Sequence, residues 1–169
     1  RITRLRPPDE QTPDALFPNN WFSTHEDGTL VLYPMKAPNR RLERRPDFIS
    51  FLQERYNATI DMRLFELESK YLEGTGSLVL DRENRFAFAA HSERTNPELV
   101  KQWAKRLGYR YHLFHTADST GLPYYHTNVV LSLGQAWAVW CPEAIIDKRV
   151  AKETARSEEH TSELQSQFR

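Results

Sequence analysis

The sequence predicts a mixed α/β (α+β) fold built from repeated modules in the order strand, strand, helix, strand. Two observations predict it. Runs rich in Val, Leu, Tyr and Phe alternate with amphipathic segments, and turn residues separate them. The same order then returns further along the chain, which is typical of repeat architectures. This interleaving favours α/β or α+β over a helical bundle.

The first module follows the turn pair Asp27-Gly28. The β-rich run Thr29–Met35 predicts a strand. A helix is expected over Pro46–Tyr56, where apolar residues recur at helical spacing and proline suits the first turn. Alternating apolar residues predict another strand over Thr59–Leu67.

The second module repeats this order. Ser77–Asp81 and Phe86–Ala90 predict a hairpin. Asn96 and Pro97 are typical of a helix start, and Gly108 is typical of a helix end.

The helix of the second module leads into a strand expected over Tyr109–Phe114. A third module is expected to begin with strands over Thr127–Leu133 and Ala136–Cys141 and a helix over Glu143–Lys152.

Composition excludes several classes of protein. The chain of 169 residues has 23 basic and 23 acidic side chains. It therefore lacks the positive electrostatic field of a dedicated nucleic-acid or membrane-surface binder. No apolar run approaches the roughly 18 residues of a membrane span. The single cysteine, Cys141, excludes an internal disulfide and fits the reducing cytoplasm. Because it follows Ala-Val-Trp, we expect a buried, inert thiol.

Metal chemistry is not expected. The six histidines are scattered, and one cysteine cannot complete a zinc site. We therefore predict no metal and no cofactor.

Both ends differ from those of a typical complete protein. The first residue is Arg1, and residues 156–166, RSEEHTSELQS, are similar to the translation of a common sequencing adapter. We expect a native domain over residues 1–155, truncated at both ends, and a non-native tail over residues 156–169.

Polar motifs occur where one predicted module meets the next. Each has a purely structural interpretation: a capped turn, a close backbone approach, a helix cap or a buried histidine. The basic run Arg40–Arg45 is expected to be a solvated loop or a helix-leading face rather than a phosphate site. The residues that carry chemistry in these motifs are Asn19, Asn20, Glu73, Arg94, His126 and Asn128.

Taken in order, FPNNW, LEGTGSLVLD, SERTNPE and YHTNV resemble the guanidino-group-modifying (pentein) superfamily. DALFPNNWFSTH and LVLYPMKAPNRRLERR are similar to its arginine-deiminase-related subgroup, which includes citrulline-utilisation hydrolases and amidinotransferases. The resemblance covers Asp14 to Lys148. It implies a partial five-bladed α/β propeller of ββαβ modules.

The resemblance also implies a reaction. In the superfamily a cysteine attacks the guanidinium carbon, an amine leaves, and a thiouronium-type intermediate passes to water or to another amine. His126 matches the general acid and base, and Glu73 matches its acidic partner. Arg94 matches the arginine that holds a substrate carboxylate. The expected partner is a small amino-acid-like substrate, with neither nucleic acid nor membrane, and the complete protein is a candidate homo-oligomer.

Two departures from the superfamily pattern stand out. Asn20 and Asn128 take the place of aspartates that grip the guanidinium in arginine deiminases, and Asn19 lies beside the first. A modified arginine or a ureido compound such as citrulline is therefore the expected substrate. The second departure is the nucleophile, because Cys141 does not match the family cysteine. The chain is therefore expected to be inactive by itself.

Two other classes of function remain open at this point. One is a non-catalytic pentein-like domain that binds a small molecule. The other is an RNA-associated module that uses the arginines of Arg40–Arg45 with exposed aromatic side chains.

Overall fold

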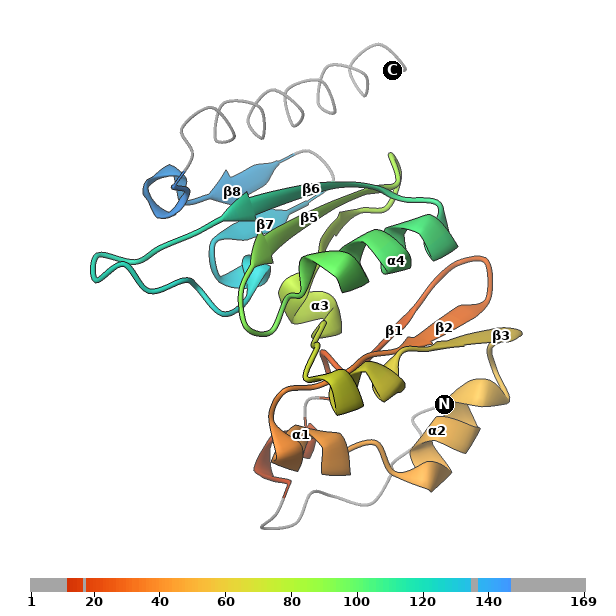
Figure 1. Ribbon diagram of the computed structural model, residues 1–169. Coiled ribbons are helices and arrows are strands. Elements are labelled where there is room, and N and C mark those ends of the chain that lie inside the picture. The colour runs from red at the N-terminus through yellow and green to blue at the C-terminus, as the bar shows by residue number, and fades with distance from the viewer. Residues whose placement is uncertain (1–11, 17, 135–136, 147–169) are drawn as a thin grey trace. The chain divides into compact units, whose positions relative to one another are not determined.

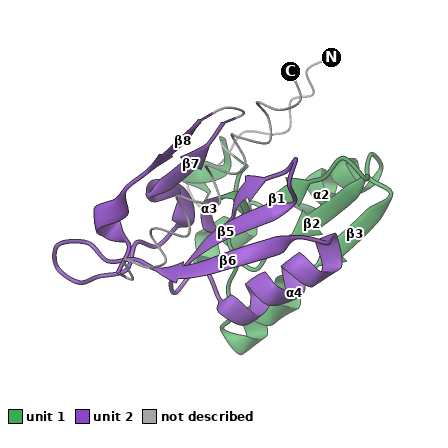
Figure 2. Ribbon diagram, turned by 90° about the horizontal axis from the view of Figure 1, so that it is seen from above, with its two compact units in different colours: residues 1–75 green, residues 76–169 purple. Residues whose placement is uncertain are grey.

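The computed structural model describes residues 12–16, 18–134 and 137–146. The chain divides into two compact units, residues 1–75 and residues 76–169, and each is described by itself (Figure 2). The tail predicted over residues 156–169 lies outside the described residues.

The first unit contains a three-stranded sheet and short helices (Figure 1). The central strand of the sheet pairs antiparallel with the first strand and parallel with the third. The strands, in spatial order, are β1 (Phe22–Thr24), β2 (Thr29–Leu32) and β3 (Ala58–Asp61). The helical segments, in chain order, are η1 (Pro13–Leu16), α1 (Pro38–Leu42), α2 (Pro46–Gln53) and η2 (Arg63–Glu68).

The second unit contains a three-stranded sheet and a two-stranded sheet. The helical turn α3 (Gly74–Ser77) spans the boundary between the two units. The strands are β4 (Val79–Asp81), β5 (Phe86–His91), β6 (Arg110–His115), β7 (Leu131–Leu133) and β8 (Ala138–Trp140). The remaining helical segments are α4 (Pro97–Leu107), η3 (Thr127–Val129) and η4 (Pro142–Ala144).

The two three-stranded sheets have the same connectivity. In each, an antiparallel hairpin is followed by a helical crossover to a strand that pairs parallel with the second strand of the hairpin. The crossover holds α1 and α2 in the first unit and α4 in the second (Figure 1). The antiparallel hairpin of β7 and β8 follows. The prediction of a mixed fold with repeated ββαβ modules is therefore confirmed.

Helix α4 shows how local sequence fixes these elements. The side chain of Asn96 accepts hydrogen bonds from the backbone N–H groups of Glu98 and Leu99, at 3.0 and 3.3 Å. Gly108 ends the helix in the left-handed conformation, with φ of +70°. Both ends lie where the sequence predicts. The helix buries Leu99, Val100, Trp103, Ala104 and Leu107.

Each unit has its own apolar core. In the first unit the fully buried Trp21 packs edge-on against Phe48 of α2, with ring centroids 5.3 Å apart. Side chains of β2 complete this core. In the second unit Phe88 of β5 and Phe114 of β6 form a cluster with residues of the β7–β8 hairpin. These cores hold the loops that carry the polar motifs.

Several predicted strands are shorter than expected: β2, for example, ends at Leu32 and β8 at Trp140. Within the predicted strand Thr59–Leu67, β3 ends at Asp61 because the Asp61 carboxylate accepts a hydrogen bond from the backbone N–H of Arg63, and η2 follows. Ser77 closes the helical turn α3 instead of beginning a strand. Thr127 begins the 3-10 turn η3, so the third module starts later than expected.

The helix predicted over Glu143–Lys152 is wrong in its described part. Residues Pro142–Ala144 form a single 3-10 turn, and Ile145 is extended. The reason is a β-bridge between Ile145 and Thr116, which draws the backbone out of the helical conformation. Residues from 147 onward lie outside the described part.

Within the described ranges, none of the helices combines the length and the apolarity needed to cross a membrane.

Candidate functional site

In the first unit, Asn20 lies against the segment that carries Glu73. Asn20 is buried and adopts the left-handed conformation, with φ of +68°. Its side-chain oxygen accepts a hydrogen bond from the hydroxyl of Thr75 at 3.1 Å. Gly74 is required here, because a Cβ at this position would lie 2.6 Å from the backbone oxygen of Asn20. The structure therefore brings two predicted site segments together.

Glu73, the one carboxylate among the predicted site residues, is completely buried. One of its oxygens accepts a hydrogen bond from the backbone N–H of Lys36 at 2.9 Å. This contact fixes the carboxylate directly before the turn α3. A buried, oriented carboxylate is well suited to hold a cationic group in a defined place.

Asn19 is held by a chain of polar contacts. Arg40 donates to the side-chain oxygen of Asn19 at 2.9 Å and to its backbone oxygen at 3.1 Å. The Nε atom of Arg40 lies 2.6 Å from the carboxylate of Glu43, which is 4% exposed. Arg40 thus links the buried carboxylate of Glu43 to Asn19 of the candidate site.

The run Arg40–Arg45 is not a solvated loop: Arg40 and Arg41 lie in α1 and Arg45 directly precedes α2, which fits the alternative of a helix-leading face. Arg44 is largely buried and donates two hydrogen bonds to Glu66, at 2.6 and 3.0 Å. Arg41 donates to the backbone oxygen of Met35 at 2.7 Å. These guanidinium groups brace the chain after β2. Sequence patterns do not indicate this role, because the acceptors lie on other segments of the fold.

Replacing Glu43 with glutamine is expected to change how stability depends on pH. Burial is the main cause that raises the pKa of Glu43 above its ordinary value of 4.5, and the nearby Arg40 opposes the shift. The folded state therefore takes up a proton more readily than the unfolded state does. The contribution of Glu43 to stability is present below pH 4.5 and is lost as the pH rises through the folded-state pKa.

Urea unfolding at a series of pH values from about 4 to about 7 tests this expectation. The stability of the native chain minus that of the Glu43→Gln variant should fall as the pH rises. The exposed carboxylate of Glu54 supplies a matched control variant, Glu54→Gln. A difference for Glu43→Gln that is flat or grows with pH would contradict the assignment.

In the second unit, His126 packs directly on Gly76. The imidazole is 6% exposed, and a Cβ on Gly76 would lie 2.6 Å from its Nδ1 atom. The ring of Tyr125 is tilted against it, with centroids 4.8 Å apart. The glycine thus makes the space that His126 occupies. The predicted buried histidine is found; it directly precedes η3 instead of leading into a strand.

A hydrogen-bonded cluster joins the segments around Ser77, Arg94 and Thr127. The Ser77 hydroxyl donates to the backbone oxygen of Arg94 at 2.8 Å and accepts from Thr95 at 2.8 Å. The hydroxyl of Thr127 donates to the backbone oxygen of Ser77 at 2.6 Å and accepts from Ala90 at 2.8 Å. This cluster places the loop that carries Arg94 beside the segment that carries His126.

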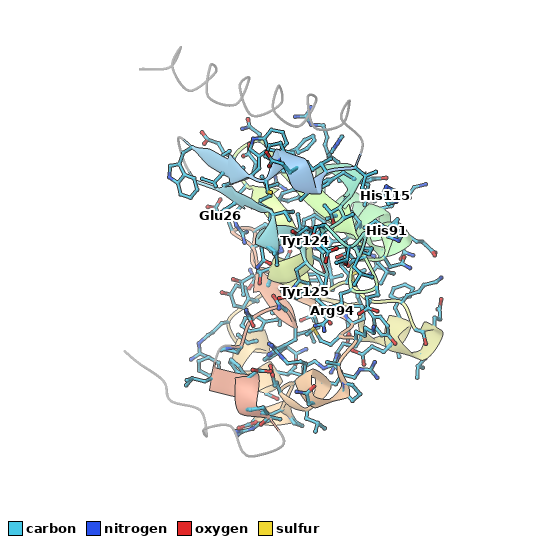
Figure 3. The ribbon with its side chains drawn as sticks, turned by 90° about the vertical axis from the view of Figure 1, so that its left-hand side faces the viewer. Glu26, His91, Arg94, His115, Tyr124 and Tyr125 are labelled. Carbon is cyan, nitrogen blue, oxygen red and sulfur yellow. The ribbon has the colours of Figure 1, made fainter. Side chains whose placement is uncertain are left out.

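Arg94 and Tyr125 approach each other from these two segments (Figure 3). The guanidinium carbon of Arg94 lies 5.2 Å from the centroid of the Tyr125 ring, within the range of a cation–π contact. Ser92 supports the pair, because its hydroxyl donates to the backbone oxygen of Tyr125 and accepts from the backbone N–H of Arg94. The segments that carry Arg94 and His126 are therefore held next to each other.

In the second unit, the predicted site residue Asn128 and the cysteine Cys141 lie outside this cluster. Asn128 is exposed within η3. Cys141 is also exposed, and its thiol donates to the carboxylate of Glu143 at 3.5 Å. The expectation of a buried thiol is wrong: Cys141 directly follows β8, and β8 itself has no buried residue.

Sequence reasoning missed the residues that assemble the cluster. Ser77, Ser92 and Thr127 are each within or beside a recognised motif, yet their bonding partners come from other motifs. The signal available in the sequence was a serine or threonine within or beside a polar motif. Within the part of the chain that the structure describes, no group of three or more His, Cys, Asp or Glu side chains is placed to hold a metal ion.

The family model described as N,N dimethylarginine dimethylhydrolase, eukaryotic, matches residues 2–165. The chain belongs to this family. The predicted resemblance to the guanidino-group-modifying superfamily is thereby confirmed. No curated relative matches the sequence.

Solved structures share the fold. The N-terminal domain of ArgZ, an arginine dihydrolase from Cyanobacteria, matches with a TM-score of 0.70 and 21% identity over 88% of this chain and 52% of that one. That structure is a cysteine-to-serine mutant bound to substrate. A second mutant of this domain, at 20% identity with the same TM-score and coverage, is covalently bonded to a reaction intermediate.

A dimethylarginine dimethylaminohydrolase in an adduct with 4-chloro-2-hydroxymethylpyridine also matches. Its TM-score is 0.58 and its identity is 17%, over 79% of this chain and 50% of that one. The chain thus spans about half the length of the ArgZ domain and of this hydrolase. The partial five-bladed propeller stays a prediction.

Proposed function

We propose that the full-length protein hydrolyses a C–N bond of a guanidino or ureido group in an arginine-like amino acid. The observation that carries the proposal is the family match over residues 2–165, combined with the buried cluster that joins the His126 and Arg94 segments. The substrate is small and water-soluble, which suits the even charge balance and a place in the cytoplasm.

The reaction runs through a covalent intermediate. A cysteine thiolate attacks the guanidinium carbon, the C–N bond to the leaving amine breaks, and His126 gives that amine a proton. Water then loses a proton to His126, attacks the same carbon and breaks the C–S bond. The covalent intermediate of the ArgZ domain supports this course. An amine in place of water would make the protein an amidinotransferase.

Glu73 is proposed as the acidic partner of His126. A carboxylate beside an imidazole fixes its orientation and supports its charged form. Complete burial and the hydrogen bond from Lys36 give Glu73 a fixed orientation in its own unit. In the sequence Glu73 is three residues before Gly76, a span of at most about 10 Å.

Arg94 is proposed to hold the substrate carboxylate. A guanidinium can bind a carboxylate through two parallel hydrogen bonds, and Arg94 is partly exposed next to Tyr125. Asn19, Asn20 and Asn128 are proposed to contact the guanidino end. Amides in place of carboxylates weaken the hold on a cationic guanidinium, so the neutral ureido group of citrulline is favoured over arginine. The family model makes dimethylarginine a further candidate substrate.

The nucleophile is proposed to be a cysteine other than Cys141. A catalytic thiol is activated by cationic neighbours, whereas Cys141 is exposed and donates to the carboxylate of Glu143. The 169-residue chain, which contains one cysteine, is accordingly expected to bind substrate without turning it over.

The decisive experiment compares His126→Gln with the native full-length protein. We expect kcat to fall by roughly 10²–10⁴-fold with little change in KM, because the proton donor is lost while the carboxylate site is kept. Dimethylarginine, arginine and citrulline are the substrates, and released amine, ammonia, citrulline and ornithine are measured. His112→Gln, a half-buried histidine of β6, is the matched control.

Three outcomes would contradict parts of the proposal. An unchanged kcat in His126→Gln would remove His126 from the reaction. A preference for unmodified arginine over its derivatives and citrulline would remove the role of the asparagines. Tight binding without turnover by the full-length protein would favour a non-catalytic binding domain.

A further inference from the structure

Two histidines end neighbouring strands of the second unit. His91 is the last residue of β5 and His115 is the last residue of β6, and the two are partners in the parallel register. Partners in a parallel pair project from the same face of the sheet, on strands about 4.8 Å apart. Both side chains are exposed, and Figure 3 shows them together at one edge.

The geometry of the pair is close to that of two ligands of one ion. Nδ1 of His91 lies 3.2 Å from Nε2 of His115, and the ring planes meet at 88°. Two nitrogens bound to one tetrahedral zinc at 2.0–2.1 Å are about 3.3–3.4 Å apart. The observed separation is therefore within about 0.2 Å of the spacing required for joint coordination.

We propose that His91 and His115 form a surface binding site for a divalent transition-metal ion of the copper, nickel and zinc class. The ion binds Nδ1 of His91 and Nε2 of His115 in place of their mutual hydrogen bond. Each neutral ring keeps its proton on the other nitrogen, so the exchange needs only a tautomer shift. Small rotations of two exposed side chains turn both lone pairs toward the ion.

Water completes the coordination of this site. No third His, Cys, Asp or Glu joins the pair within the residues that the structure describes. The ion is therefore exchangeable. Imidazole ligands select copper, nickel and zinc over magnesium and calcium, which prefer oxygen. Helical spacing in the sequence cannot reveal the pair, since 24 residues separate the two histidines.

Calorimetric titration of the 169-residue chain with Cu²⁺, Ni²⁺, Zn²⁺ and Mg²⁺ tests the site. We expect binding in the order Cu²⁺ tightest, then Ni²⁺ and Zn²⁺, with Mg²⁺ showing none. His91→Gln and His115→Gln should each weaken Cu²⁺ binding by tenfold or more, and the double variant should abolish this site. His112→Gln is the matched control, because its side chain lies on the opposite face of β6 and should leave the affinity unchanged.

A second measurement uses only the native chain. Substoichiometric Cu²⁺ should broaden the NMR ring signals of His91 and His115 before those of the other histidines. An unchanged Cu²⁺ affinity in the double variant would overturn the proposal, as would broadening that spares both rings. This outcome is independent of the proposed hydrolase, whose test measures His126 and turnover.

Discussion

Replacing Thr127 with valine is expected to lower the free energy of unfolding of the second unit by about 2–4 kcal/mol. Thr127 is completely buried, and its hydroxyl serves two backbone groups, the oxygen of Ser77 and the N–H of Ala90. Valine has nearly the same shape but leaves each group without this partner. Urea unfolding of the chain measures the loss, which should be recovered largely by Thr127→Ser.

Thr116 offers a matched control for this substitution. It is 1% exposed, and its hydroxyl has no hydrogen-bond partner among the described residues. Thr116→Val should therefore be neutral or slightly stabilising, because a polar atom leaves an apolar setting. If both variants lost the same stability, packing of the methyl group would be the cause, and the bridging role of Thr127 would be wrong.

Replacing Gly76 with alanine is expected to displace His126. The added Cβ would lie 2.6–2.8 Å from three atoms of the imidazole, closer than atoms approach without a bond. Overpacking of this kind costs about 1–3 kcal/mol. Alanine is otherwise favoured over glycine in a helical turn by about 0.5–1 kcal/mol, so any net loss arises from the ring contact. In the full-length protein, turnover should fall with the displaced imidazole.

Gly121→Ala separates this contact from backbone strain. Gly121 has φ of +85°, and a Cβ added there would meet nothing within 4 Å, so alanine adds strain without contact. The NMR ring signals of His126 should shift in Gly76→Ala and remain in place in Gly121→Ala. Unchanged His126 signals together with unchanged stability in Gly76→Ala would show that the ring does not depend on this glycine.

Much of the fold follows from short-range signals. The helix between Asn96 and Gly108 is predicted at both ends because its capping groups are neighbours in the sequence. Strand lengths are less well predicted. Asp61, Ser77 and Thr127 each use a side-chain oxygen to bond the backbone, and this competes with the sheet ladder.

The candidate site, like the fold, could be predicted from the sequence only in part. Glu73, Arg94 and His126 are predicted through their motifs, and their roles stay predictions; the structure shows that Glu73 and His126 are buried and that Arg94 lies against the ring of Tyr125. The bracing of Asn19 by Arg40 and Glu43 was not predicted, since a basic run in a sequence resembles a solvated surface. The exposure of Cys141 was likewise missed, because the apolar run before it predicts a buried strand, whereas β8 has no buried residue.

The sequence by itself determined the repeated strand, strand, helix, strand order and the family of this protein, because periodicity, turns, caps and motifs are local. Only the tertiary structure decided that the Ser77 and Thr127 hydroxyls tie the motifs together and that His91 meets His115. Both depend on strand register and on contacts between distant segments, which form only when the cores pack.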